Sequence, residues 1–137
     1  MIEVYYINLD RSIDRRSDII KSIQHNKIIL KRFKAFDGLF INLNTIKYLK
    51  KNNYINELTD NNYIYLKKGR VGTYMSHILL WEKLNNENKK YGIILEDDIN
   101  IAKNINCCLT NIINHLPKEW DFIFLGYDGI NKSLFYN

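Results

Sequence analysis

Three carboxylates directly follow an apolar run in the segment Ile93-Ile94-Leu95-Glu96-Asp97-Asp98. A short, continuously apolar run is typical of a central strand in a parallel sheet, because such a strand is buried on both faces. Ligands of open parallel sheets bind beyond the carboxyl ends of the strands, so we expect these carboxylates at a binding edge. Strand alternation through the segment would point Glu96 and Asp98 to one side and Asp97 to the other.

The acidic triplet has two interpretations. Adjacent carboxylates repel one another unless a cation or a proton offsets their charge, and Mg²⁺ or Mn²⁺ with oxygen ligands is suited to that task. Glu96, Asp97 and Asp98 are therefore candidate metal ligands. Acidic, solvated turns after a strand are also common, and the segment alone does not choose between a metal site and such a turn.

Hydrophobic patterns on both sides of this segment predict alternating strands and helices. Strands are expected at Glu3–Leu9, Ile28–Phe36, Tyr91–Leu95 and Trp120–Leu125, and helices at Ser12–Gln24, Val71–Leu84 and Ile101–Leu116, with a short helix between Ile41 and Asn62. This order favours an α/β fold in which helices cover a mainly parallel, Rossmann-like sheet of the doubly wound type. The strand at 3–9 should lie beside the strand at 92–95 and parallel to it, so that Asp10 and Glu96 open on one edge.

Local signals mark where these elements begin and end. Ser12 is the expected N-cap of the first helix, which should carry Ile13, Ile19, Ile20 and Ile23 on its apolar side. Asp37-Gly38 predicts a turn after the second strand, and Pro117 should stop the last helix.

Polar side chains also follow the first strand, in Asn8-Leu9-Asp10-Arg11 and then Arg15-Arg16. Asn8 and Asp10 are suited to hydrogen bonds with a base or ribose, and an arginine is suited to clamp a phosphate through its planar fork. The alternative is that Arg15 and Arg16 only decorate the exposed side of a helix. No Gly-x-Gly-x-x-Gly or Walker A pattern follows this strand, which disfavours a dinucleotide cofactor.

A third group of residues precedes and opens the helix at 71–84. Gly69 and Gly72 allow the backbone to come close to a neighbour, and Ser76 and His77 in the next turn are candidates to face a ligand. The alternative for His77 is a structural histidine without a ligand.

Length and charge limit the classes of protein that fit. The chain has 137 residues, which is enough for one domain with a buried core and too little for two, so residues 1–137 are expected to form a single domain. The net charge of +5 favours an anionic partner. The tyrosines do not alternate with basic residues along one face, so no nucleic-acid partner is expected.

The remaining signals concern the compartment. Cys107 and Cys108 are adjacent, which disfavours a disulfide between them, and we expect reduced thiols. There is no signal-peptide pattern, because Asp10 and Arg11 interrupt the first apolar run, and no apolar run is long enough to cross a membrane. These signals predict a cytoplasmic protein, either free or peripherally associated with a membrane or a host-cell compartment.

Taken together, several segments resemble in order and spacing the glycosyltransferase family 25 domain, which includes lipooligosaccharide and procollagen galactosyltransferases. The matching segments are Tyr6-Ile7-Asn8-Leu9-Asp10-Arg11-Ser12-Ile13-Asp14-Arg15-Arg16, Lys34-Ala35-Phe36-Asp37-Gly38, Gly69 and Gly72 with Ser76-His77 and Trp81, Ile94-Leu95-Glu96-Asp97-Asp98, and Trp120-Asp121 through Gly126. The resemblance covers nearly the whole chain.

The resemblance implies a GT-A-type fold and transfer of a hexose, galactose or glucose, from a nucleotide-diphosphate sugar, expected to be a UDP-sugar, to a glycan or hydroxylysine-type acceptor. It implies that Glu96, Asp97 and Asp98 hold Mn²⁺ or Mg²⁺ against the diphosphate, and that Ser76 and His77 lie near the donor sugar. It also implies that Asn8, Asp10, Arg11, Arg15 and Asp37 line the nucleotide pocket.

The chain departs from the family pattern in three respects. Arg70 stands where relatives usually carry an acidic residue, and Thr73 stands where they usually carry a cysteine. Family members also continue for about another half of the domain after the strand that ends here at Gly126, so the chain is expected to be the donor-binding half. The inverting reaction that the resemblance implies needs a general base, and Asp128 is the candidate because it follows the last predicted strand. The alternative is a non-catalytic module that binds a nucleotide sugar or a nucleic acid.

Overall fold

The fold is built on a parallel sheet of three strands in the order β2-β1-β3, seen in a computed structural model that describes residues 2–55 and 67–126. The strands are β1 (Ile2–Asn8), β2 (Ile28–Lys34) and β3 (Ile93–Glu96). Both pairings are parallel, with Ile7 of β1 opposite Phe33 of β2 and Glu96 of β3. The predicted neighbourhood of the first and the carboxylate-bearing strand is therefore confirmed, and their carboxyl ends share one edge.

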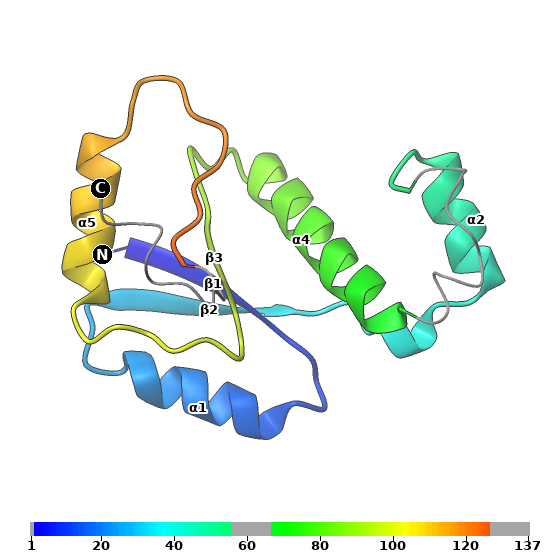
Figure 1. Cartoon of the computed structure of the whole chain (residues 1–137), viewed down its shortest axis with the longest axis horizontal. Helices are drawn as coiled ribbons and strands as arrows, with labels where there is room; N and C mark the ends of the chain where they lie inside the picture. The colour runs from blue at the N-terminus through cyan, green and yellow to red at the C-terminus, as the bar shows by residue number, and fades with distance from the viewer. Residues whose placement is uncertain (1, 56–66, 127–137) are drawn as a thin grey trace, which may run out of the picture.

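Helices cover both faces of this sheet (Figure 1), as expected for a doubly wound α/β fold. The helices are α1 (Ile13–Ile23), α2 (Leu43–Lys51), α4 (Lys68–Asn86) and α5 (Ile105–His115), with a 3₁₀ turn, η1, at Gly38–Phe40. None of the helices in the described ranges is both long and apolar enough to cross a membrane.

The alternation of β1 divides the core into two layers. Tyr5 and Ile7 pack with Leu80 and Leu84 of α4 on one face. Val4 packs on the opposite face, in a cluster with Ile93 of β3 and Leu109 of α5. Because successive strand residues point to opposite faces, β1 is buried by α4 on one side and by α5 on the other.

A smaller cluster lies beyond the sheet. Ile41 and Ile46 are its buried members, and Phe36 and Val71 pack against them. This cluster joins α2 and the 3₁₀ turn to the amino end of α4. Because that end of α4 points away from the sheet, α2 lies apart from the sheet (Figure 1).

The prediction of a strand at Trp120–Leu125 is wrong, because residues 120–126 form no strand. The ring of Phe122 instead meets the Trp81 ring of α4 edge-on, with centroids 5.8 Å apart, and Phe124 packs on Phe122 at 5.3 Å. A strand is stabilised by a hydrogen-bonded ladder with its neighbour, and β3 offers only four residues for one. Aromatic contacts with α4 take the place of that ladder.

The first helix also differs from its prediction. Ile19 and Ile23 are buried, whereas Ile13 and Ile20 are exposed. The helix therefore docks by a narrower edge than its apolar pattern suggests. Ser12 is at the N-cap position, but its side chain makes no capping hydrogen bond. Its carbonyl oxygen accepts the N–H of Arg16 at 3.1 Å, which is the first hydrogen bond of the helix.

The later helices differ from prediction at their ends. The helix α4 starts at Lys68, so Gly69 and Gly72 both lie within its first turns, and α5 starts at Ile105 rather than near 101. Leu116 is extended, as expected for the residue before a proline, so the helix stops where Pro117 predicted. Cys107 and Cys108 of α5 are free thiols.

Candidate functional site

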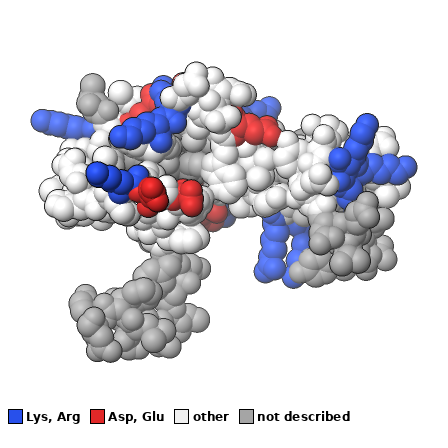
Figure 2. All heavy atoms as spheres, turned by 90° about the horizontal axis from the view of Figure 1, so that it is seen from above, with Lys and Arg blue, Asp and Glu red and all other residues white. Residues whose placement is uncertain are grey.

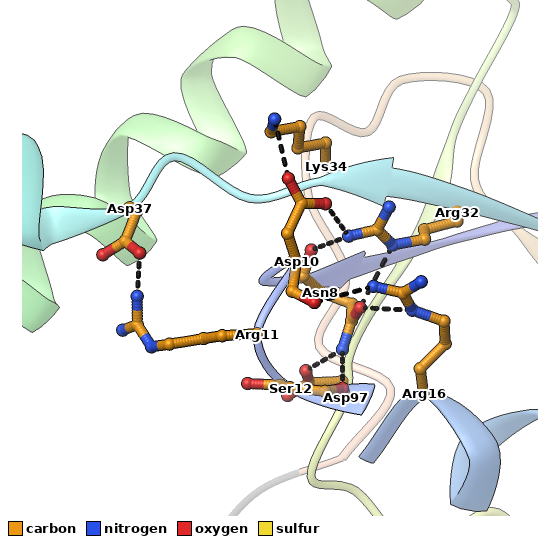
Figure 3. Close-up of polar contacts among 9 residues, drawn as sticks. All are labelled: Asn8, Asp10, Arg11, Ser12, Arg16, Arg32, Lys34, Asp37 and Asp97. Carbon is orange, nitrogen blue, oxygen red and sulfur yellow. Dashed lines mark hydrogen bonds and ion pairs between the residues drawn. The ribbon is translucent and has the colours of Figure 1, made fainter. Parts of the chain in front are cut away.

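The loops that follow β1 and β3 meet at the carboxyl edge of the sheet. The Nδ2 atom of Asn8, the last residue of β1, donates a hydrogen bond of 2.6 Å to Oδ2 of Asp97, just after β3 (Figure 3). Neighbouring parallel strands bring these two residues together although 89 positions separate them. The expectation that both polar segments open on one edge is therefore confirmed.

Asn8 is the buried centre of this edge, with a side chain that is satisfied entirely by the protein. Its Nδ2 atom also donates to the Ser12 carbonyl oxygen at 3.0 Å, and its Oδ1 atom accepts from Nε of Arg16 at 3.0 Å and Nε of Arg32 at 3.1 Å. These four bonds use both N–H groups and both lone pairs of the amide. Asn8 is 1% exposed, so in this arrangement it positions neighbours and offers no free group to a base or ribose.

The loop after Asn8 is fixed by ion pairs. Asp10 accepts from Nζ of Lys34 at 2.7 Å and Nη2 of Arg32 at 2.6 Å, and these two hydrogen bonds lower the pKa of Asp10 to about 2. Arg11 pairs with Asp37, whose Oδ1 atom also accepts the Leu39 N–H at 2.9 Å at the start of the 3₁₀ turn. Figure 3 shows Arg11 reaching from this loop across to Asp37.

The three carboxylates of the acidic triplet do not point as strand alternation predicts. Glu96 ends β3 and contacts Nε2 of His77 at 3.5 Å, whereas residues 97 and 98 form a turn. Within that turn both carboxylates accept from one atom, Nη1 of Arg15, at 3.2 Å for Asp97 and 3.1 Å for Asp98. The alternation stops at Glu96 because the chain leaves the sheet there, so Asp97 and Asp98 act together and Glu96 contacts a different side chain.

The carboxylates fit a divalent-cation site that a bound phosphate completes, and they do not fit a site made by protein ligands alone. Across residues 2–55 and 67–126 there is no group of three or more His, Cys, Asp or Glu side chains that could hold a metal ion. Asp97 and Asp98 nevertheless converge on a single cationic atom, and Mg²⁺ is commonly held by one or two carboxylates together with the phosphates of a substrate. The residues fit a cation whose coordination a phosphate ligand completes.

The histidine and serine of α4 have different surroundings. Ser76 is fully buried, donates to the Gly72 carbonyl at 2.7 Å and accepts the Phe36 N–H at 2.8 Å, so it connects α4 to the segment after β2. Gly72 approaches that same segment, because a Cβ atom there would lie 2.9 Å from the Phe36 oxygen. The close approach predicted for Gly72 is therefore to backbone. His77 alone of this group reaches the carboxyl edge, beside Glu96.

Arg32 and Lys34 are members of the site that the sequence reasoning missed. They lie at the carboxyl end of β2 and both bind Asp10, and Arg32 also binds Asn8. The signal was available, because two residues that are two apart at the end of a parallel strand share a face at the same binding edge. Asp128, the candidate base, lies outside the described residues.

Other charged groups and a surface pocket lie away from the carboxyl edge of the sheet. Figure 2 shows the Lys and Arg side chains of one face in several groups, some of them beside carboxylates. An open pocket of about 590 Å³ lies near the amino ends of β1 and β3, where Glu3, Lys27, Lys89, Lys90 and Tyr91 line it. It is not at the carboxyl edge where Asp97 and Arg15 lie.

Comparisons with known proteins match the chain to one family. The family model described as glycosyltransferase family 25 (LPS biosynthesis protein) matches residues 1–137. Probable inactive glycosyltransferase 25 family member 3 of Bos taurus is 27% identical over 134 residues, which are 96% of this chain and 22% of that protein. Procollagen galactosyltransferase 2 of Homo sapiens is 23% identical over 127 residues, covering 90% of this chain and 20% of that protein.

A third relative gives the same picture. Procollagen galactosyltransferase 1 of Danio rerio is 27% identical over 131 residues, covering 90% of this chain and 21% of that protein. The chain spans about a fifth of the length of these relatives.

Proposed function

This chain belongs to glycosyltransferase family 25, and from that membership we propose that residues 1–137 form the donor-binding domain of a hexosyltransferase. The donor is a nucleotide-diphosphate sugar, with UDP-galactose and UDP-glucose as the first candidates. The acceptor is a glycan or a hydroxylysine-type side chain. Relatives named procollagen galactosyltransferases favour galactose as the donated sugar.

One observation supports this proposal above the others, namely the convergence of Asp97 and Asp98 on one cationic atom at the carboxyl edge. That edge is where open parallel sheets bind ligands. Asn8 fixes Asp97 from the neighbouring strand, so at least one carboxylate is held before any ligand arrives. A nucleoside diphosphate carries charge that a cation on this pair would offset.

In the proposed site each residue has a role that follows from its contacts. Asp98 and Asp97 hold Mn²⁺ or Mg²⁺, which when bound neutralises charge on the departing nucleoside diphosphate. Arg15 and Arg11 supply guanidinium groups for phosphate oxygens. Asp37 orients Arg11, Asp10 orients Arg32 and Lys34, and both carboxylates border the nucleotide, while Asn8 and Ser76 hold the surrounding segments. Glu96 and His77 face the donor sugar.

The acceptor hydroxyl oxygen bonds to the anomeric carbon with inversion as the bond from that carbon to the diphosphate oxygen breaks; the nucleoside diphosphate leaves with the electron pair, and the hydroxyl proton passes to a general base. Asp128 is our candidate for that base. A positioned base typically contributes about 10²–10⁴-fold to the rate.

Donor binding tests this proposal directly. Calorimetry of the 137-residue chain with UDP, UDP-galactose and UDP-glucose, with and without Mn²⁺, should show binding that Mn²⁺ strengthens. Asp98→Ala should remove the effect of Mn²⁺. The matched control is Asp18→Ala, which removes an exposed carboxylate from α1 that contacts only Lys21, at 3.9 Å, within the described ranges. Equal Mn²⁺ dependence in the wild type and Asp98→Ala would show that the carboxylate assignment is wrong.

A second candidate function is donor binding without transfer. It is favoured by the names of relatives such as inactive glycosyltransferase 25 family member 3 of Homo sapiens, 28% identical over 134 residues. Donor hydrolysis and transfer to a panel of acceptor sugars separate the two functions. The transferase yields product, whereas the binding module retains UDP-sugar affinity and yields none.

A further inference from the structure

The side chain of Arg15 occupies the position between Asp97 and Asp98 that a divalent cation needs. Its Nη1 atom alone donates to both carboxylates, at 3.2 Å and 3.1 Å. Within the described part of the chain, its Nε and Nη2 atoms make no hydrogen bond to protein. Arg15 therefore neutralises the pair while keeping the rest of its planar fork open to a ligand.

Asp97 and Asp98 differ in what else holds them. The Asp97 side chain is only 11% exposed, and its 2.6 Å bond to Asn8 uses Oδ2, whereas Arg15 contacts Oδ1. The Asp98 side chain is 52% exposed, and that of Arg15 is 56% exposed. Ion pairs between such exposed groups contribute little to stability, so Arg15 can leave while the carboxylates stay in place.

The neighbouring cations are not equivalent to Arg15. Arg11 has its own carboxylate in Asp37, and Arg16 and Arg32 bind the amide of Asn8. In the described residues, Arg15 is the cationic side chain that contacts Asp97 and Asp98. It is also on the first turn of α1, directly beside the loop after β1.

We propose that Arg15 is a resident counterion, which a divalent cation displaces from Asp97 and Asp98 and which then binds the diphosphate of the donor. This inference rests on the proposed function, since it takes the carboxylate pair to be the place of the divalent cation. Two cations cannot share the same carboxylate oxygens without repulsion. The released guanidinium finds a matching partner in phosphate oxygens, which accept its fork in a bidentate manner.

Two opposite effects follow for a chain that lacks Arg15. A bare metal ion no longer competes with a resident cation, so Mn²⁺ alone should bind more tightly. The metal complex of UDP loses a cation that contacts its phosphates, so it should bind less tightly. A residue with a merely structural role in the loop would weaken both.

The test is a pair of titrations on the 137-residue chain and its Arg15→Gln variant. Free Mn²⁺ is followed by electron paramagnetic resonance, first without nucleotide, and UDP with saturating Mn²⁺ is followed by calorimetry. We expect the Kd for Mn²⁺ alone to fall about three- to tenfold in Arg15→Gln, the range expected when the two ion pairs of the exposed Arg15 no longer compete with the metal. We expect the Kd for UDP with Mn²⁺ to rise.

Two further variants identify the source of any change. Lys21→Gln removes the same charge from the last turn of α1 and should leave the Kd for Mn²⁺ within twofold of wild type. Arg15→Gln combined with Asp98→Asn should lose the tighter binding of Mn²⁺ that Arg15→Gln alone produces. Thermal unfolding of each variant establishes that it is folded.

The outcomes separate this inference from the function on which it rests. If Arg15→Gln and the wild type bind Mn²⁺ equally and UDP binding still needs Mn²⁺, displacement is overturned and the proposed function stands. If neither the wild type nor Arg15→Gln binds Mn²⁺ while both proteins bind UDP, Asp97 and Asp98 do not hold a metal ion. The proposed displacement of Arg15 is then wrong as well. If UDP binding without metal disappears in Arg15→Gln, Arg15 serves in place of the metal, which also overturns displacement.

Discussion

The amide of Asn8 connects four parts of the chain, since its partners are Ser12, Arg16, Arg32 and Asp97. Removing it takes one hydrogen bond each from the half-buried side chains of Arg16, Arg32 and Asp97, and a polar group that loses a partner away from water costs more than the hydrogen bond itself contributes. Asn8→Ala should therefore lower the free energy of unfolding by about 2–4 kcal/mol. Urea denaturation measures this, with Asn111→Ala on the exposed surface of α5 as the control. A loss no larger than that of the control would contradict the central role of Asn8.

At the same scale, the carboxylates of Asp10, which is exposed, and Glu3, which is half-buried, make stability depend on pH. Hydrogen bonds from Lys34 and Arg32 lower the pKa of Asp10 from 3.8 to about 2, and hydrogen bonds from Lys31 and Lys89 lower that of Glu3 from 4.5 to about 2. A carboxyl whose pKa is lower in the folded state stabilises the fold above its unfolded pKa, and the effect is lost as pH falls through the folded pKa.

Stability should accordingly decline as the pH falls from about 4.5 to about 2, the interval between these pKa values. Asp10→Asn should make the decline shallower because one of the two groups no longer titrates. Denaturant unfolding at a series of pH values across this interval measures the slope. A variant curve parallel to that of the wild type would show that the ion pairs of Asp10 do not form in solution.

At the scale of elements, the sequence predicts a strand or helix well where burial produces a regular apolar pattern. It predicts less well where contacts with other elements decide whether the segment joins the sheet. The apolar run before Glu96 and the β-branched run before Asn8 predicted two strands, their parallel pairing and the edge on which their polar ends meet. Trp120–Leu125 is similarly apolar and aromatic, yet it forms no strand and its Phe122 ring packs on Trp81. A composition that suits a strand does not specify whether a partner strand is available.

The candidate site shows the same division. The position of Asp97 and Asp98 at the binding edge follows from strand polarity alone. Their pairing with Arg15, and the satisfaction of Asn8 by two arginines, depend on how α1 and β2 approach β1, which no local pattern encodes. For that reason residues expected to contact a ligand, such as Asn8 and Ser76, are engaged with protein.

Two glycines of α4 offer a matched test of packing between elements. A Cβ atom at Gly72 would lie 2.9 Å from both the Phe36 oxygen and the Gly38 nitrogen, whereas a Cβ atom at Gly69 would meet nothing within 4 Å. Gly72→Ala should destabilise the fold by about 1–3 kcal/mol, since backbone must move to admit the methyl group. Gly69→Ala should be neutral or stabilise by up to about 1 kcal/mol through helix propensity. Chemical denaturation of both variants checks the contrast, and equal effects would contradict this packing.

At the scale of the whole molecule, aromatic side chains form an exposed strip next to the carboxyl edge. Phe122 is 59% exposed and Phe124 is 86% exposed, and they continue the contact between His77 and Trp81. Exposed apolar patches favour association. The chain should therefore self-associate as its concentration rises, and replacing both phenylalanines with serine should reduce this.

Sedimentation velocity over a range of concentrations measures the association. Ile13→Ser is the control, because Ile13 is exposed on α1 and is not part of the aromatic strip. Association that is unchanged by the double replacement, or that is reduced equally by Ile13→Ser, would place the contact surface elsewhere.

The strand order β2-β1-β3 has a consequence for the order in which the molecule assembles. β1 reaches β2 through a short crossover, but β3 follows it by some ninety positions, so closing that loop costs more chain entropy. Pairing of β1 with β2 should come first, leaving the other edge of β1 open until β3 arrives. The hydrogen bond between Asn8 and Asp97 belongs to that last event. A ligand that binds Asp97 and Asp98 thus recognises only completed molecules and, by mass action, draws the chain toward them.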